Sequence, residues 1–201
     1  MPLGAAKAAL LGAAGGGEIS YDPAYTWISD VVMADSTTAT LTFDSLPTDY
    51  HALHLVGNYN TTAGTYLLAN VSSTVTGYCS GGYEIGPSSA GLGPYKVNYA
   101  SASTNFAYVG GYGSSTTNIN EKGGCFLEMW LPGYTNTDKP KACYVKTAAH
   151  GTGAWYQNIQ GEQVFRNLID TAIDEINIWF GSGYFYEGSA FSLYGVGTAS
   201  G

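Results

Sequence analysis

Charged side chains are scarce in this 201-residue sequence, where they make up 11% of the residues against about 25% in an ordinary globular domain. Lysine and arginine together number seven and the acids fifteen, so the net charge is −8 at pH 7. A surface this poor in basic residues is unsuited to capturing nucleic acid or anionic membranes by charge. We therefore expect neither a nucleic-acid partner nor insertion into a membrane.

Cysteine and histidine are also rare, and their spacing does not suit chemistry. The three cysteines are Cys79, Cys125 and Cys143. Their odd number and wide spacing predict buried small residues more than a disulfide framework, although one disulfide bond is still possible. His51 and His54 would point to opposite faces of a strand, and His150 is alone in a predicted loop. The sequence has no zinc spacing, phosphate-binding glycine loop or nucleophile elbow. We expect no metal site and no cofactor.

Long amphipathic helices are missing from the body of the chain. Short alternating or β-branched runs lie between clusters of Gly, Ser, Thr, Asn and Pro, a pattern that predicts an all-β, antiparallel β-sandwich. The expected strands are Tyr25 to Met33, Thr38 to Phe43, Ala52 to Asn58, Tyr66 to Val71, Phe106 to Val109, Gly124 to Leu131, Lys141 to Thr147, Ile173 to Phe180 and Ala190 to Val196.

Alternation is clearest in residues 125–131 and 175–180. One face of each strand is apolar and is predicted to belong to the core. The other face carries an acid and a tryptophan in each strand, Glu128 with Trp130 and Glu175 with Trp179. We expect this second face to be partly apolar and to pack against a neighbouring subunit.

Two segments rich in Gly, Ser, Tyr and Asn interrupt this rhythm, at about residues 72–103 and 110–123. They are predicted to be long loops, where surface function is usually found. A third segment, residues 161–170, has clustered apolar residues around Arg166 and is predicted to form one or two helical turns.

Residues 1–17, MPLGAAKAALLGAAGGG, are predicted to form an attachment arm, and residues 18–201 a single sandwich domain. Eleven of the seventeen residues are Ala or Gly. The segment therefore has too few large apolar side chains to offset the entropy cost of its own ordering in isolation. The best periodicity is helical, with a small-residue face that allows close backbone approach. The expected docking residues are Leu3, Gly4, Ala8, Leu10, Leu11 and Gly12. A signal or lipid-facing segment and a passive leader are the alternatives.

Tyrosine is in excess, with seventeen copies, several of them in predicted loops. An exposed tyrosine offers a rigid apolar face and a polar tip, which suits contacts with proteins and with sugar rings. The candidate receptor or partner contacts are Tyr83, Tyr95, Tyr112, Tyr184 and Tyr186. The segment GSGYFYEGS, residues 181–189, is the best candidate for an exposed aromatic tip. The alternative is that many tyrosines complete the core or lie between subunits.

Acidic residues near residue 170 are the remaining candidates for catalysis, because a glycosidase needs two carboxylates at a set separation. They are Glu162, Asp170, Asp174 and Glu175. Acids at the polar edge of a strand or turn are normally solvated, so we expect no catalytic residue and no enzyme. A glycan-degrading enzyme is kept as an alternative.

The C-terminal stretch DEINIWFGSGYFYEGSAFSLYGVG resembles the ending of a diverse group of tailed-phage virion proteins, in which an I-x-I-x-F strand is followed by a Gly/Ser turn and GS-x-F-x-LYG-I/V. The match runs from Ile176 to Val196. The segments Leu41 to Gly57 and Phe126 to Val145 resemble the same group, and the leader resembles the opening of some phage fibre and appendage proteins. Residues 72–123 show no such resemblance, so a partner-specific surface is expected there.

This resemblance implies a non-enzymatic virion structural protein made in the host cytoplasm, with a jelly-roll-like β-sandwich docked to other virion proteins of tail or capsid by its arm. A short tail fibre or adhesin, forming a homotrimer and contacting a host receptor such as a surface glycan, is the first expectation. A capsid decoration protein that stabilises the head is the alternative within the same class.

Overall fold

The computed structural model describes residues 25–62, 67–71, 78–88, 91–101, 107–110, 125–139, 141–150, 156–165 and 171–197. Every regular secondary-structure element in these ranges is a β-strand, which confirms the predicted all-β class. The attachment arm and Tyr112 lie outside the described residues, so the predictions made for them stay predictions.

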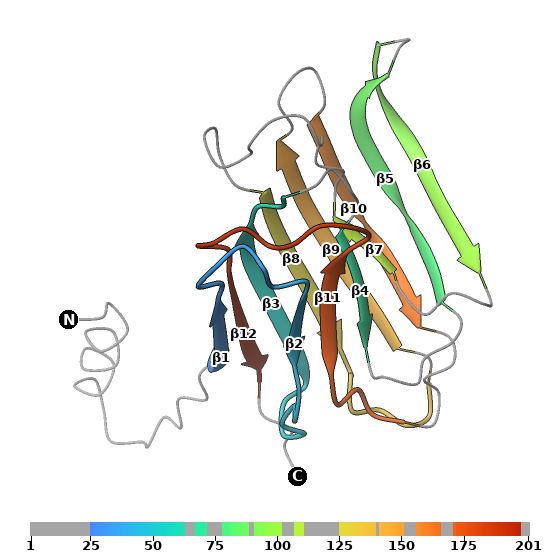
Figure 1. The fold of residues 1–201 in the computed structure, drawn as a ribbon. Helices are drawn as coiled ribbons and strands as arrows, with labels where there is room; N and C mark the ends of the chain where they lie inside the picture. Colours follow the sequence, from blue (N-terminus) through green and yellow to red (C-terminus); the bar gives the residue numbers. More distant parts are fainter. Residues whose placement is uncertain are drawn as a thin grey trace, which may run out of the picture.

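The described strands form two antiparallel sheets (Figure 1). The large sheet has the order β1-β12-β3-β8-β9-β10-β5-β6, and the small sheet the order β2-β11-β4-β7. The strands are β1 (Tyr25–Val32), β2 (Thr40–Phe43), β3 (Ala52–Tyr59), β4 (Leu67–Val71), β5 (Tyr78–Ser88), β6 (Gly91–Ser101), β7 (Ala107–Gly110), β8 (Cys125–Pro132), β9 (Lys141–His150), β10 (Tyr156–Phe165), β11 (Ile176–Phe180) and β12 (Ala190–Val196).

Eight of these strands have the connectivity of a jelly roll. When β5, β6, β9 and β10 are set aside, two sheets of four remain, β1-β12-β3-β8 and β2-β11-β4-β7. The first four strands alternate between the sheets, and the last two return to lie beside them, β11 between β2 and β4, β12 between β1 and β3. Two interlocked Greek keys of this kind define the jelly roll, so the predicted fold class is confirmed.

The other four strands are two insertions that lengthen one sheet. The β5–β6 hairpin lies between β4 and β7 in sequence, and β9 and β10 lie between β8 and β11. They meet where β10 pairs with β5, and together they continue the large sheet beyond β8 (Figure 1). The outer face of the large sheet is therefore much wider than a jelly roll alone would give.

The core lies between the sheets and follows the predicted alternation. In β8 the residues Cys125, Leu127, Met129 and Leu131 are buried, and in β11 the residues Ile176, Ile178 and Phe180 are buried. In β12, Phe191 and Leu193 face the core, as does Cys143 of β9. Gly57 lies directly opposite Phe191, whose ring fills the space that a side chain at this position would need.

Three predictions about local structure were wrong. His150, predicted to lie in a loop, is the last residue of β9. Residues 161–165, predicted to be helical, belong to β10, which pairs with β9 on one side and β5 on the other. Most of residues 72–103, predicted to be a loop, forms the β5–β6 hairpin. Its many glycines hide the alternation, and its Tyr, Val and Ile residues favour strands once a neighbouring strand is available. Pro94 is tolerated because β6 is an edge strand.

Candidate functional site

Aromatic side chains form a row across the outer face of the large sheet. Successive antiparallel pairings place Trp27, Tyr194, His54, Trp130 and Tyr144 opposite one another on β1, β12, β3, β8 and β9. We call these five residues the aromatic row. Their neighbours along β12, β3, β8 and β9 are buried in the core, so the row itself faces outward. The alternation of the strands thus produces an aromatic surface at one register position.

Tyr25 packs over the middle of this row. Its ring meets those of His54, Trp130 and Tyr194 edge to face, with centroid distances of 5.5, 6.0 and 6.2 Å. The imidazole of His54 stacks on the indole of Trp130 at 4.0 Å and an interplanar angle of 18°. These contacts fix the rings relative to one another, so the surface is preorganised.

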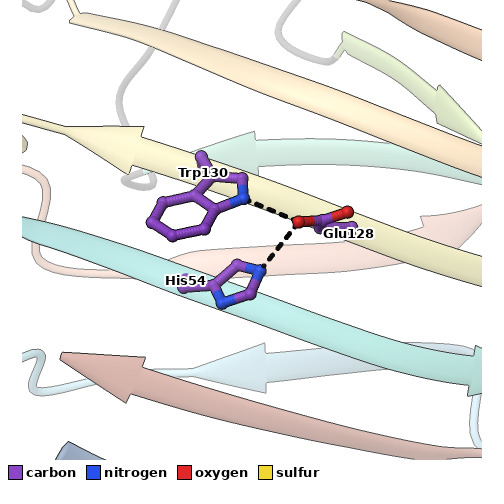
Figure 2. A network of polar contacts seen from close by, with 3 residues as sticks. All are labelled: His54, Glu128 and Trp130. Carbon is purple, nitrogen blue, oxygen red and sulfur yellow. Dashed lines mark hydrogen bonds and ion pairs between the residues drawn. The ribbon is translucent and has the colours of Figure 1, made fainter. Parts of the chain in front are cut away.

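Glu128 joins Trp130 and His54 in a small polar network (Figure 2). The Trp130 indole N–H donates to Glu128 Oε1 at 2.8 Å, and His54 Nε2 lies 3.3 Å from the same oxygen. The indole hydrogen bond is the main reason why the pKa of Glu128 is lowered. Burial lowers the pKa of His54 more than the nearby Glu128 carboxylate raises it. The carboxylate is therefore ionised and the imidazole neutral at pH 7.

A second register position on this face carries charged side chains. Asp30, Ser192, Val56, Glu128 and Lys146 lie opposite one another on the same five strands, and we call them the polar row. Asp30 accepts hydrogen bonds from Ser192 and from the Trp27 indole. Both lower the pKa of Asp30, and the bond from Ser192 has the larger effect. Each carboxylate of the polar row thus holds an indole of the aromatic row on its own strand.

Several rings of this surface are open to solvent. Trp27 is 59% exposed and Tyr25 46% exposed, and Tyr144 at the other end of the row is 36% exposed. The ammonium group of Lys146 lies 5.9 Å from the centre of the Tyr144 ring, within range of a cation–π contact. We refer to Tyr25, the aromatic row and the polar row together as the aromatic face.

The predicted contact tyrosines are dispersed. Tyr83 and Tyr95 lie in β5 and β6 at positions that pair with Lys96 and Glu84, not in a loop as predicted. Tyr184 is 47% exposed and Tyr186 half-buried, in the turn between β11 and β12. Of the two candidates whose side-chain exposure the structure describes, Tyr184 and Tyr186, Tyr184 has the exposure expected of an aromatic tip.

The turn that carries Tyr184 is tied to two other loops at one end of the sandwich. Phe185 N–H donates to Thr38 O, and Tyr186 N–H donates to Asn60 O. Tyr184 N–H also donates to the Thr62 hydroxyl at 2.9 Å. This end of the molecule is separate from the aromatic row. The turn ends where β12 begins, at Ala190, and Tyr194 of the aromatic row lies four residues further along that strand.

The predicted carboxylate cluster is not brought together in the part of the chain that the structure describes. Glu162 is on β10 in the large sheet, whereas Asp174 and Glu175 precede β11 in the small sheet; Asp170 lies outside the described residues. Glu175 hydrogen-bonds the amide of Asn177. Among the described residues no group of three His, Cys, Asp or Glu side chains is placed to hold a metal ion, and no helix is long and apolar enough to cross a membrane.

Sequence reasoning identified only part of the aromatic face. Glu128 and Trp130 were predicted to lie on a partly apolar outer face, but His54, Tyr25, Trp27 and Tyr194 were not connected with it. The signal was present in the alternation: in β3 and β12 an aromatic ring occupies the face opposite the buried leucines. Trp179, predicted like Trp130 to lie on the outer face of its strand, belongs to the small sheet, in register with Thr40 and Leu68.

Comparison with solved structures finds the alginate lyase Aly36B, with 11% sequence identity and a TM-score of 0.27 over 84% of this chain and 78% of that chain. A mutant of the same enzyme in complex with an alginate trisaccharide matches with 9% identity and a TM-score of 0.25, over 83% of this chain and 81% of that chain. At these TM-scores the likeness carries no argument about function. No protein-family model and no curated protein matches the chain.

Proposed function

We propose that this protein is a non-enzymatic binding protein of a tailed-phage virion, a tail fibre or adhesin whose aromatic face contacts the host receptor. The observation that carries the proposal is the set of exposed rings on the outer face of the large sheet, led by Trp27 and Tyr25. Solvent-exposed aromatic surface on a rigid sheet is costly unless a partner covers it.

The polar network within the face supports binding over catalysis. A general base must reach the proton it removes. His54 Nε2, the imidazole atom beside Glu128, is buried, and Glu128 Oε1 already accepts the indole N–H of Trp130. These contacts hold the three side chains in position, which supports a binding role.

The virion setting is supported by the resemblance of the C-terminal stretch, and the fold explains what that stretch does. Its residues form β11 and β12, each of which lies between two strands of the jelly roll. Such a motif belongs to the framework of a shared fold, while the arm attaches the framework to the particle and the sheet face meets the partner.

Antibody labelling of purified particles of the phage that encodes the protein tests this proposal. We expect label on the tail, at the sites where fibres or adhesins attach. Label distributed over the head would favour the capsid-decoration role, in which the protein stabilises the shell by binding its subunits. Particles that carry no label at all would refute the virion proposal.

A further inference from the structure

We propose that the aromatic face is a binding site for an uncharged glycan chain that runs across β1, β12, β3 and β8. This inference deepens the proposed function, since it names the chemical class of the receptor. It moves the contact surface from the predicted loops to the sheet.

The two tryptophans of the aromatic row are separated by a length that suits a chain of sugars. Three interstrand steps of about 4.8 Å lie between β1 and β8, so the Trp27 and Trp130 positions are about 14 Å apart. The rings of Tyr25, Tyr194 and His54 lie between them. An extended oligosaccharide can place apolar C–H groups against several of these rings at once.

The carboxylates of the polar row supply hydrogen-bond acceptors beside those rings. Glu128 and Asp30 each accept one indole N–H, and an ionised carboxylate has about four acceptor positions. Sugar hydroxyls donate to such groups through charge-assisted hydrogen bonds. The same indole contacts hold both carboxylates in place, so little side-chain entropy is lost when a ligand binds.

The composition of the face disfavours a second copy of this chain as the occupant. A protein interface usually has a core depleted in charge. Here Asp30, Glu128 and Lys146 run alongside the aromatic row, and the register position beyond them carries Val32, Asn58 and Phe126. A copy of the same sheet would bring four carboxylates and two ammonium groups together, so two carboxylates would be covered without a cationic partner.

The same acids select against anionic glycans. Two carboxylates face one ammonium group in the polar row, and Lys146 is close enough to Glu128 to lower its pKa. A sulfated or uronic-acid chain would meet net negative charge, whereas an uncharged chain would not. The expected ligand is therefore built from neutral hexoses.

The test uses the full chain on an array of uncharged glucose-, mannose- and galactose-containing oligosaccharides together with sulfated and uronic-acid chains. The best uncharged ligand is then titrated by calorimetry. Trp27→Ala should weaken its binding about tenfold or more, Trp27→Phe should weaken it less, and Asp30→Asn should weaken it several-fold, by roughly the loss of one charged hydrogen bond. Tyr184→Ala is the matched control, because this ring is similarly exposed at the separate loop end, and should change the affinity less than about twofold.

Thermal melting of each variant shows whether it is folded, and Trp27→Phe and Asp30→Asn preserve shape if Trp27→Ala fails to fold. The proposal is overturned if only anionic glycans bind, if no glycan binds, or if Tyr184→Ala removes binding while the Trp27 and Asp30 variants do not. It is also overturned if Trp27→Ala leaves glycan binding intact and instead dissociates the protein into monomers. Release of reducing sugar from the bound chain would contradict the non-enzymatic proposal but would support the glycan site. If no glycan binds on the array, the glycan site is refuted, and antibody labelling of particles still tests the virion proposal independently.

Discussion

At the scale of single residues, the large sheet depends on close pairs that composition does not reveal. Gly57 on β3 lies opposite Phe191 on β12, and a β-carbon at Gly57 would overlap the ring of Phe191. A glycine in a strand usually weakens it, but here it makes room for an aromatic ring in the core. Gly195 makes room for the ring of Tyr50 in the same way.

Gly57→Ala should therefore lower the free energy of unfolding by about 1–3 kcal/mol, the usual cost of overpacking a core. Phe191→Leu alone should also destabilise the protein because it removes buried ring surface. In the double variant the two losses should be less than additive, since the smaller Leu side chain makes room for the new methyl group. Urea denaturation of the four proteins measures this, and strictly additive losses would contradict the contact.

His54 should make stability depend on pH. Its pKa is held below the ordinary value of 6.5 by burial, so the unfolded chain binds more protons than the folded protein as the pH falls through 6.5. The free energy of unfolding should then decrease as the pH is lowered from about 7 to about 5. As the pH falls below 4.5, the ordinary pKa of a glutamate, the lowered pKa of Glu128 in the folded protein causes a further decrease in the free energy of unfolding.

His54→Gln should flatten the profile between about pH 7 and about pH 5. Denaturation midpoints at several pH values measure the effect. A His54→Gln profile parallel to that of the wild type would show that His54 is not the group responsible.

At the scale of elements, the arm and the sandwich are expected to be independent. Deletion of residues 1–17 should leave a folded sandwich that no longer joins the particle, because a segment made mostly of Ala and Gly has few large apolar groups to offer a core. Circular dichroism and incorporation into particles measure the two halves of this expectation. A truncated chain that unfolds, or that still incorporates at normal occupancy, would contradict it.

Sequence patterns were sufficient for the elements whose two faces differ. The alternation in residues 125–131 and 175–180 identified β8 and β11 together with their buried faces. The same logic failed for β5, β6 and β10, where glycine, proline and glutamine interrupt the pattern and the strands are specified by pairing with one another.

Only part of the aromatic face could be predicted from the sequence, for a related reason. Alternation shows which residues share a face of one strand, but it does not show which strands are neighbours. Trp27, His54 and Trp130 come together only because β12 returns between β1 and β3, while β8 lies on the far side of β3. A topology of this kind follows from long-range packing and not from any local pattern.

At the scale of the whole molecule, the two outer sheet faces are expected to have different roles. The aromatic face of the large sheet is proposed for the receptor, which leaves the outer face of the small sheet, with Trp179 half-buried in β11, for contacts between subunits. We expect a homotrimer, and Trp27→Ala should not change the oligomeric state. Light scattering measures this, and a monomer at high micromolar concentration would count against a stable trimer in solution.

The most direct test of the central claim is the binding of the labelled chain to cells of the host of the proposed phage, compared among wild type, Trp27→Ala and Tyr184→Ala. The account predicts saturable binding that Trp27→Ala weakens by about tenfold or more and that Tyr184→Ala leaves within about twofold. Binding that is lost with Tyr184→Ala and kept with Trp27→Ala would contradict the claim that the protein acts through the face of its large sheet.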